Sequence, residues 1–263
     1  MKFRRFAVAS VGALAIASLA LAACSSTSNS ASAGSASSTP SVAPSAALLA
    51  AAAGLNGKGY DMTLTAAGIT GHGSVDPSNH AVTLAAKGSE GGQTYELDLT
   101  GIGSDLWVKV DLGALNSQVG LDPKKWLKID ATKVDDSTIG LDLSNLSDVL
   151  DIASLTKAMS NVQRTDATHL TGTIDLTNLS GVEKPDADVL KKAGAAAKSV
   201  PFTATLDGQG RLSDLKINGD SIDSGLSVDI ALSNVGSPTA VTPPPAADVV
   251  PAPAAIYQIL GSN

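Results

Sequence analysis

The sequence has 263 residues, with 18 Lys and Arg against 25 Asp and Glu, and a formal net charge of −7. An acidic chain without a basic cluster argues against nucleic acid as a partner, because the phosphate backbone must be neutralised by Lys and Arg. Cys24 is the single cysteine, which excludes an intramolecular disulfide and a zinc site built on several thiolates.

The first residues have the three parts of a secretory signal peptide. A basic head is followed by a mostly apolar run over residues 6–23, which ends in small side chains. The last residues of this run, with the one that follows, read Leu21-Ala22-Ala23-Cys24. They resemble a bacterial lipobox, in which the Cys24 thiol takes a diacylglycerol and cleavage leaves Cys24 as the new N-terminus. We therefore predict a signal peptide at residues 1–23 and lipidation at Cys24.

This interpretation predicts a protein held by its lipid anchor on the extracytoplasmic face of the cell membrane. Two alternatives compete with it. Residues 6–23 could form an uncleaved membrane helix, since about 18 residues is the lower limit for spanning a bilayer. Cys24 could also follow an ordinary signal peptide by chance.

A low-complexity stretch follows the anchor. Residues 25–45 consist almost entirely of Ser, Ala, Thr, Gly and Pro and carry no charge. Such a segment has too few large apolar side chains to offset the entropy of ordering, so we predict a lipidated Cys and a disordered tether over residues 24–45. A flexible chain of this length spans roughly 25 Å, enough to hold a domain away from a membrane surface.

The folded domain is predicted over residues 46–250. It opens with a short helix over residues 46–55, which Asn56-Gly57 ends. Alternation of apolar and polar residues then predicts strands around residues 60–64, 82–86, 95–99 and 106–110. Turn composition is found between them at Gly71-His72-Gly73, Asp76-Pro77-Ser78-Asn79 and Glu90-Gly91-Gly92. Strands at this spacing predict an antiparallel meander with one apolar and one polar face.

A five-residue pattern occurs twice in this region. Trp107-Val108-Lys109-Val110-Asp111 recurs as Trp126-Leu127-Lys128-Ile129-Asp130. In both copies, alternation puts Trp, Lys and Asp on one face and the two aliphatic residues on the other. We interpret the copies as two similar strands whose tryptophans cap the sheet edge. The alternative is that the two rings stack on a sugar.

The second half of the domain mixes helical and strand patterns. Apolar residues from Leu146 to Met159 predict an amphipathic helix that begins near Ser144, and a second helix is predicted from Pro185 to Lys198. Further strands are predicted around residues 170–176, 200–206, 212–217 and 226–232, with a hairpin turn at residues 207–210. Past Gly236 the Pro-rich segment either wraps the domain or hangs free, and residues 251–263 are expected to be a C-terminal tail.

No catalytic motif is found along the chain. His72, His80 and His169 lie in or beside predicted turns without the spacing of a metal site. Ser74 lacks the Gly-x-Ser-x-Gly elbow of serine hydrolases. The segment 220–225 lacks the terminal Glu of a calcium loop. We therefore predict that the protein is not an enzyme and uses no metal and no cofactor.

Several of these features together resemble one family. They are the lipobox, the Ser/Ala tether, the opening Leu48-Leu49-Ala50-Ala51-Ala52-Ala53, the Leu-Trp-Val-Lys and Trp-Leu-Lys-Ile-Asp strands, the Leu-rich helix after Leu143, the hairpin Leu206-Asp207-Gly208-Gln209-Gly210-Arg211-Leu212, and the ending Pro-Ala-Ala-Asp-Val-Val. Over roughly residues 47–250 the chain is similar to the actinobacterial LppX/LprA/LprF/LprG lipoproteins.

The resemblance implies an α+β fold: a single curved antiparallel β-sheet, similar to the half-barrel of the LolA/LolB lipoprotein carriers, with α-helices covering its concave apolar face. It also implies an envelope lipoprotein that holds acyl chains of lipids or glycolipids in an apolar cavity for transfer. The alternative is a non-carrier envelope lipoprotein that acts as a scaffold for protein contacts. Either protein is expected to be a monomer.

Alternation along the strands and helices identifies candidates for the lipid-binding cavity, with a lipid or glycolipid as ligand. They are the apolar residues Leu97, Leu99, Val108, Val110, Leu127, Ile129, Leu150, Met159, Phe202, Leu226, Val228 and Ile230.

Overall fold

The computed structural model describes residues 42–66, 68–90, 92–130, 133, 152–179, 185, 187–223 and 226–259. The predicted signal peptide and Cys24 lie outside these residues, as do Leu150 and the first half of the helix predicted from Ser144. Within the described ranges, no helix is both long enough and apolar enough to span a bilayer.

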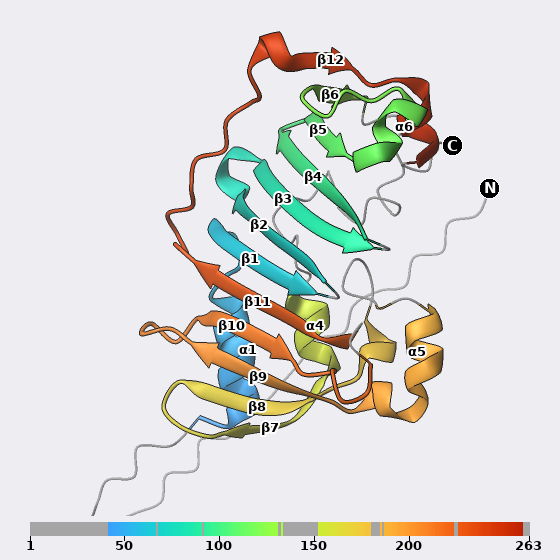
Figure 1. Ribbon diagram of the computed structural model, residues 1–263. Coiled ribbons are helices and arrows are strands. Elements are labelled where there is room, and N and C mark those ends of the chain that lie inside the picture. Colours follow the sequence, from blue (N-terminus) through green and yellow to red (C-terminus); the bar gives the residue numbers. More distant parts are fainter. Residues whose placement is uncertain are drawn as a thin grey trace, which may run out of the picture. The chain divides into compact units, whose positions relative to one another are not determined.

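One large β-sheet dominates the described part of the chain (Figure 1). Its twelve strands are hydrogen-bonded in the order β12-β6-β5-β4-β3-β2-β1-β11-β10-β9-β8-β7, and the sheet does not close into a barrel. The prediction of a single antiparallel sheet is confirmed except at one edge, where β12 runs parallel to β6. The strands are β1 (Tyr60–Ala66), β2 (Ile69–Asp76), β3 (Ala81–Glu90), β4 (Gln93–Ile102), β5 (Asp105–Asp111), β6 (Trp126–Ile129), β7 (Met159–Arg164), β8 (His169–Ile174), β9 (Val200–Leu206), β10 (Leu212–Ile217), β11 (Val228–Ser233) and β12 (Val249–Pro251).

Two meanders make up this sheet. Strands β1 to β6 follow one another from the middle of the sheet toward one edge, and β7 to β11 run from the other edge back to the middle. The antiparallel pair β1–β11 joins the meanders, with Leu64 opposite Ile230 and Met62 opposite Leu232. The hairpins join strands that are neighbours in the sequence, whereas the β1–β11 pair joins strands from near the two ends of the domain's sequence.

Strand β2 corrects one sequence-based expectation. Gly71-His72-Gly73 was expected to form a turn, but it lies inside β2, with Gly73 opposite Met62 of β1 and Leu84 of β3. Glycine is tolerated in a strand where backbones approach closely. A Cβ at Gly73 would collide with the carbonyl oxygen of Thr83. The glycines therefore mark a tight β2–β3 approach rather than a chain reversal.

Two other predicted turns are confirmed, whereas Gly91 of the predicted turn Glu90-Gly91-Gly92 lies outside the described residues. The Asp76 carboxylate accepts a hydrogen bond from the Asn79 N–H in the 3-10 turn Pro77–Asn79. In the β9–β10 hairpin, the Asp207 carboxylate accepts hydrogen bonds from the N–H groups of Gln209 and Arg211, at 2.8 and 2.9 Å. Such side chain to backbone bonds are the reason that Asp is favoured in turns.

Helices α1 (Pro44–Ala53) and α4 (Ile152–Ala158) pack against one another and against β7, and α1 also contacts β10. In Figure 1 both lie behind the β7–β11 end of the sheet. Helix α1 begins two residues earlier than predicted, so Pro44 and Ser45 belong to the helix and not to the tether. Proline suits the first turn, because its φ is preset and its missing N–H would have no helical partner.

The other α-helices among the described residues are short. They are α2 (Asn116–Val119), α5 (Ala187–Ala193) and α6 (Ala254–Ile259). The helix predicted from Pro185 to Lys198 stops being α-helical at Gly194, whose φ of +57° suits glycine, and continues as a 3-10 segment. The helix predicted through Met159 ends at Ala158, and Met159 is the first residue of β7.

The segment after β11, residues 234–259, lies against the sheet, and we call it the C-terminal strap. It runs from β11 to β12 along the left side of Figure 1. The Gly236 N–H donates to the Gly59 carbonyl at 2.7 Å near its start. At its end β12 pairs with β6, and the side chain of Ile256 in α6 is buried. The segment therefore wraps the domain, and the boundary expected at residue 250 cuts through β12.

Candidate functional site

The pairing register places most of the predicted lipid-binding residues on one face of the sheet. Directly opposed residues of antiparallel strands project to the same side. Leu97 lies opposite Val110, and Leu99 lies opposite Val108, which lies opposite Leu127. In the other meander the opposed residues are Phe202, Ile217 and Val228 across β9, β10 and β11, and next to them Leu215 and Ile230. The face continues between these groups through Leu99, Leu84, Gly73, Met62 and Leu232.

These residues do not form one compact pocket. Strands β3, β2 and β1 separate β4 from β11, so the two strands are roughly 19 Å apart along the sheet at about 4.8 Å per step. The candidates Val108 and Leu127, on β5 and β6, therefore do not neighbour the candidates Phe202 and Val228, on β9 and β11. Alternation predicts which face a side chain occupies, but it does not predict which strands lie side by side.

One row of this apolar face crosses five neighbouring strands, and we call it the open stripe. It consists of Leu64 on β1, Gly71 on β2, Ala86 on β3, Leu97 on β4 and Val110 on β5, each opposite the next. The small residues Gly71 and Ala86 lie between the larger leucines. Beyond Leu64 the same row continues into β11, β10, β9 and β8 through Ile230, Leu215, Ala204 and Leu170.

The apolar face is buried unevenly along and across the strands. In the row beside the open stripe, Leu99 is 5% exposed, and Val108 and Leu127 are equally buried. In the open stripe, Leu97 is 37% exposed, and its other side chains are half-buried. On β8 to β11, the end of the sheet where α1 and α4 pack, the row is fully covered. The apolar row is thus packed at β8 to β11 and only partly covered at β1 to β5, where Leu97 is exposed.

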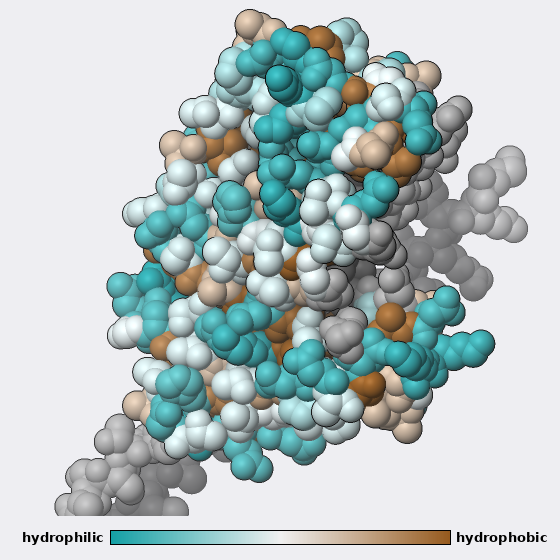
Figure 2. Space-filling view, viewed as in Figure 1, coloured by the Kyte–Doolittle hydropathy of each residue, from teal (hydrophilic) through white to brown (hydrophobic). Residues whose placement is uncertain are grey.

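The opposite face of the sheet is polar. Figure 2, viewed as in Figure 1, shows hydrophilic residues over most of the visible surface. Lys109 pairs with Asp98 at 2.6 Å, and its ammonium also lies 5.1 Å from the ring centre of Trp126. Lys128 lies over Trp107 in the same way, at 5.7 Å. Trp107 is only 8% exposed, which leaves it too buried to serve as a platform for a sugar.

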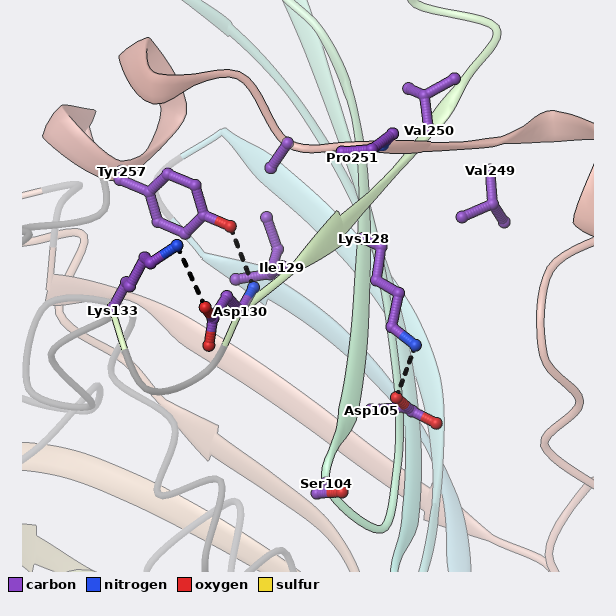
Figure 3. A pocket seen from close by; sticks show the side chains of 11 residues that line it. Ser104, Asp105, Lys128, Ile129, Asp130, Lys133, Val249, Val250, Pro251 and Tyr257 are labelled. Carbon is purple, nitrogen blue, oxygen red and sulfur yellow. Dashed lines mark hydrogen bonds and ion pairs between the residues drawn. The ribbon is translucent and has the colours of Figure 1, made fainter.

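Two surface hollows are formed by described residues. One, of about 730 Å³, lies between β6 and the C-terminal strap (Figure 3). Its lining includes Lys128, Ile129, Asp130, Lys133, Val250 and Tyr257. The other, of about 740 Å³, lies where β1 and β10 end and β11 begins, and its lining includes Val228, Asp220 and Asp229. Each holds one predicted lipid-binding residue, Ile129 or Val228, among charged groups.

The charged groups of the first hollow are engaged with one another. The Lys128 ammonium pairs with Asp105 at 2.8 Å, and Lys133 pairs with Asp130 at 3.1 Å. The Asp130 N–H donates to the Tyr257 hydroxyl at 3.0 Å, as the dashed lines in Figure 3 show. The Asp130–Tyr257 hydrogen bond ties the end of β6 to α6, and the Lys128–Asp105 pair ties β6 to β5.

The carboxylates whose pKa values are lowered accept structural hydrogen bonds. Burial opposes ionisation of Asp61, but hydrogen bonds from Ser74, Asn234 and Thr239 outweigh it and lower its pKa from 3.8 to about 2. Hydrogen bonds from the Thr168 N–H and from His169 hold the pKa of Asp166 well below its usual range. Within the described ranges, no group of three or more His, Cys, Asp or Glu is arranged to hold a metal ion.

Two predicted site residues lie at unexpected places. Met159 is the first residue of β7, at the sheet edge, and lies opposite Ile174. It was predicted to lie on a helix because the apolar residues keep a helical spacing as far as Met159, although the helix ends at Ala158. Leu226 is buried but precedes β11, which begins at Val228. Leu150 lies outside the described residues.

Sequence reasoning recognised the alternation of Leu64 and Ala86 without assigning them to the site, and it missed Gly71. The signal for Gly71 was present in the alternation of Ile69, Gly71, Gly73 and Val75. It was obscured because paired glycines are typical of turns.

No protein-family model matches this chain, and no curated protein matches its sequence. The resemblance to the LppX/LprA/LprF/LprG lipoproteins therefore stays a prediction that depends on the quoted motifs.

Proposed function

We propose that this protein is a membrane-anchored envelope lipoprotein that binds lipid or glycolipid acyl chains on the apolar face of its sheet, for lipid transfer. The observation that carries this proposal is the open stripe. Soluble proteins seldom leave a contiguous apolar surface exposed unless it has a binding role. Here the row that is packed at β8 to β11 continues through Leu64 and Val110, which are half-buried, and Leu97, which is 37% exposed.

The dimensions of the open stripe suit an acyl chain. Four strand spacings separate β1 from β5, which corresponds to roughly 19 Å. Each leaflet contributes about half of a bilayer's hydrocarbon thickness of roughly 30 Å, so its acyl chains reach roughly 15 Å. An acyl chain can therefore lie across the strands, with the small residues Gly71 and Ala86 beneath its middle.

The predicted lipobox and tether support a location of this site at a membrane. In this proposal Cys24 carries the anchor, and the Ser/Ala stretch lets the domain reach lipid in the same membrane. Helices α1 and α4 contact β7, and α1 also contacts β10. In this proposal the β1–β5 part of the apolar face takes the ligand. A curved, half-barrel sheet, as the family resemblance implies, would wrap this part around the chain.

A fluorescent fatty acid that brightens in apolar surroundings tests the proposal by titration of the full chain. Leu97→Gln puts a polar amide in the open stripe and should weaken binding about tenfold, because burying a leucine contributes about 1.5 to 3 kcal/mol. Leu49→Gln is the matched control, since Leu49 is 53% exposed on α1. The control should bind like the wild type.

The scaffold alternative makes a different prediction for the same titration. A protein partner could cover the open stripe instead of a lipid, and the fatty acid would then bind weakly or not at all. Failure of the wild type to bind, or equal weakening by both variants, would refute the proposed function and favour the scaffold.

A further inference from the structure

One carboxylate fixes the start of the C-terminal strap to the middle of the sheet. Asp61 of β1 accepts hydrogen bonds from the N–H and the hydroxyl of Thr239, both at 2.8 Å, and from the Asn234 amide at 2.6 Å. It also accepts one from the Ser74 hydroxyl of β2. The strap passes so close that a Cβ at Gly59 would collide with Pro238. Asp61 thus connects strap and sheet.

The far end of the strap covers the β6 edge. The Lys125 ammonium donates to Asp248 and to the Ala247 carbonyl, both at 3.0 Å, just before β12 pairs with β6. Ile256 of α6 is 4% exposed and belongs to the same hydrophobic cluster as Leu127 and Ile129. Ile129 also lines the same hollow as Val250, Ala252 and Tyr257, so the strap lies beside β6, one strand beyond the open stripe.

The strap is held by a short strand ladder, by polar bonds at its two ends and by the buried side chain of Ile256. Strand β12 pairs with β6 over three residues, and Pro243-Pro244-Pro245 have no N–H groups with which to bond the sheet. Segments held by short ladders and accessible polar bonds open locally while the rest of a domain stays folded. The strap has the features of such a segment.

We propose that the C-terminal strap is a gate of the apolar face, held closed by the Asp61–Thr239 contact. Its opening exposes Leu127 and Ile129 and extends the open stripe to β6, for entry and release of an acyl chain. This inference rests on the proposed function, because the gate regulates the same face. Asp61 alternates with Met62 and so projects from the polar face. It acts on the ligand only through the strap.

Hydrogen exchange measured by mass spectrometry on the full chain tests the gate, in parallel with the release rate of the fluorescent fatty acid. Thr239→Val removes the hydroxyl that donates to Asp61 and keeps the Thr239 N–H. Asp61→Asn removes the negative charge of the carboxylate that accepts both of these hydrogen bonds. Asp98→Asn is the control, because Asp98 pairs with Lys109 on the same polar face. For Asp61→Asn, exchange in β12 and α6 should rise about 10- to 100-fold, the range expected for charged hydrogen bonds, with β8 to β10 unchanged. Fatty-acid release should accelerate with it, and Thr239→Val should do the same to a smaller extent.

Three results would overturn the gate. Exchange in β12 and α6 could stay at the wild-type rate, it could rise equally throughout the sheet, or it could rise locally without any change in fatty-acid release. A wild-type protein that takes up no fatty acid contradicts the proposed function itself. That result is distinguishable because it is obtained before any variant is compared.

Discussion

Two leucines on the same strand and the same face test the uneven burial of the apolar face. Leu99 and Leu97 lie two residues apart on β4, at 5% and 37% exposure. Leu99→Ala should destabilise the protein by about 2 to 5 kcal/mol, because it leaves a cavity among packed side chains. Leu97→Ala should cost about 1.5 kcal/mol or less, since the three lost carbons are only partly buried and solvent fills the space.

The assay is urea denaturation of delipidated protein, followed by circular dichroism, because bound lipid would shield Leu97. Both variants should keep the wild-type dependence on urea concentration, so that midpoints report stability directly. For a domain of this size, each kcal/mol corresponds to about 2 to 4 °C in melting temperature, so Leu99→Ala should melt roughly 6 to 12 °C lower for a 3 kcal/mol loss. Equal losses for the two variants would show that the open stripe is packed like the core, and the reasoning would be refuted.

Three further predictions concern the anchor, the tether and acid stability. Cys24→Ala should leave the precursor unprocessed and should remove partitioning into detergent; a variant that is cleaved and partitions like the wild type would exclude the lipobox. Deletion of residues 25–41 should leave the melting temperature unchanged, whereas a large decrease would show that the tether packs on the domain. Because the folded-state pKa of Asp61 is about 2 against an ordinary 3.8, its contribution to stability is complete above about pH 4 and is lost as the pH falls toward 2. As the pH falls from 4 to 2, the urea midpoint should therefore decrease less steeply for Asp61→Asn than for the wild type. An identical decrease of the midpoint with pH in the two proteins would contradict the role of Asp61.

Alternation along the chain was sufficient to predict most strands and the face that each side chain occupies. Val108 and Val110 were assigned correctly to the apolar face of β5, opposite Leu99 and Leu97. The same alternation could not separate them by burial, since Val108 is packed and Val110 is half-buried. Burial depends on what lies above each row, and that is decided by contacts between elements far apart in the sequence.

Long-range pairing explains the remaining differences. Leu64 lies opposite Ile230 because β1 pairs with β11 and so joins the two meanders. No local sequence pattern predicts that pair. The position of the strap depends on hydrogen bonds between Asp61 and Thr239, residues whose local sequence suggests nothing more than a strand and a Pro-rich segment. The open stripe could therefore be assembled only from the register, although the alternation of most of its members was visible beforehand.

Native mass spectrometry of the protein, released gently from its membrane, tests the central claim most directly. The account predicts a discrete added mass of one lipid or glycolipid on the wild type, in addition to the anchor. That mass should be lost or strongly reduced in Leu97→Gln and retained in Leu49→Gln. A wild-type spectrum that shows only the lipid-free mass under the same gentle conditions would contradict the claim that this apolar face binds acyl chains.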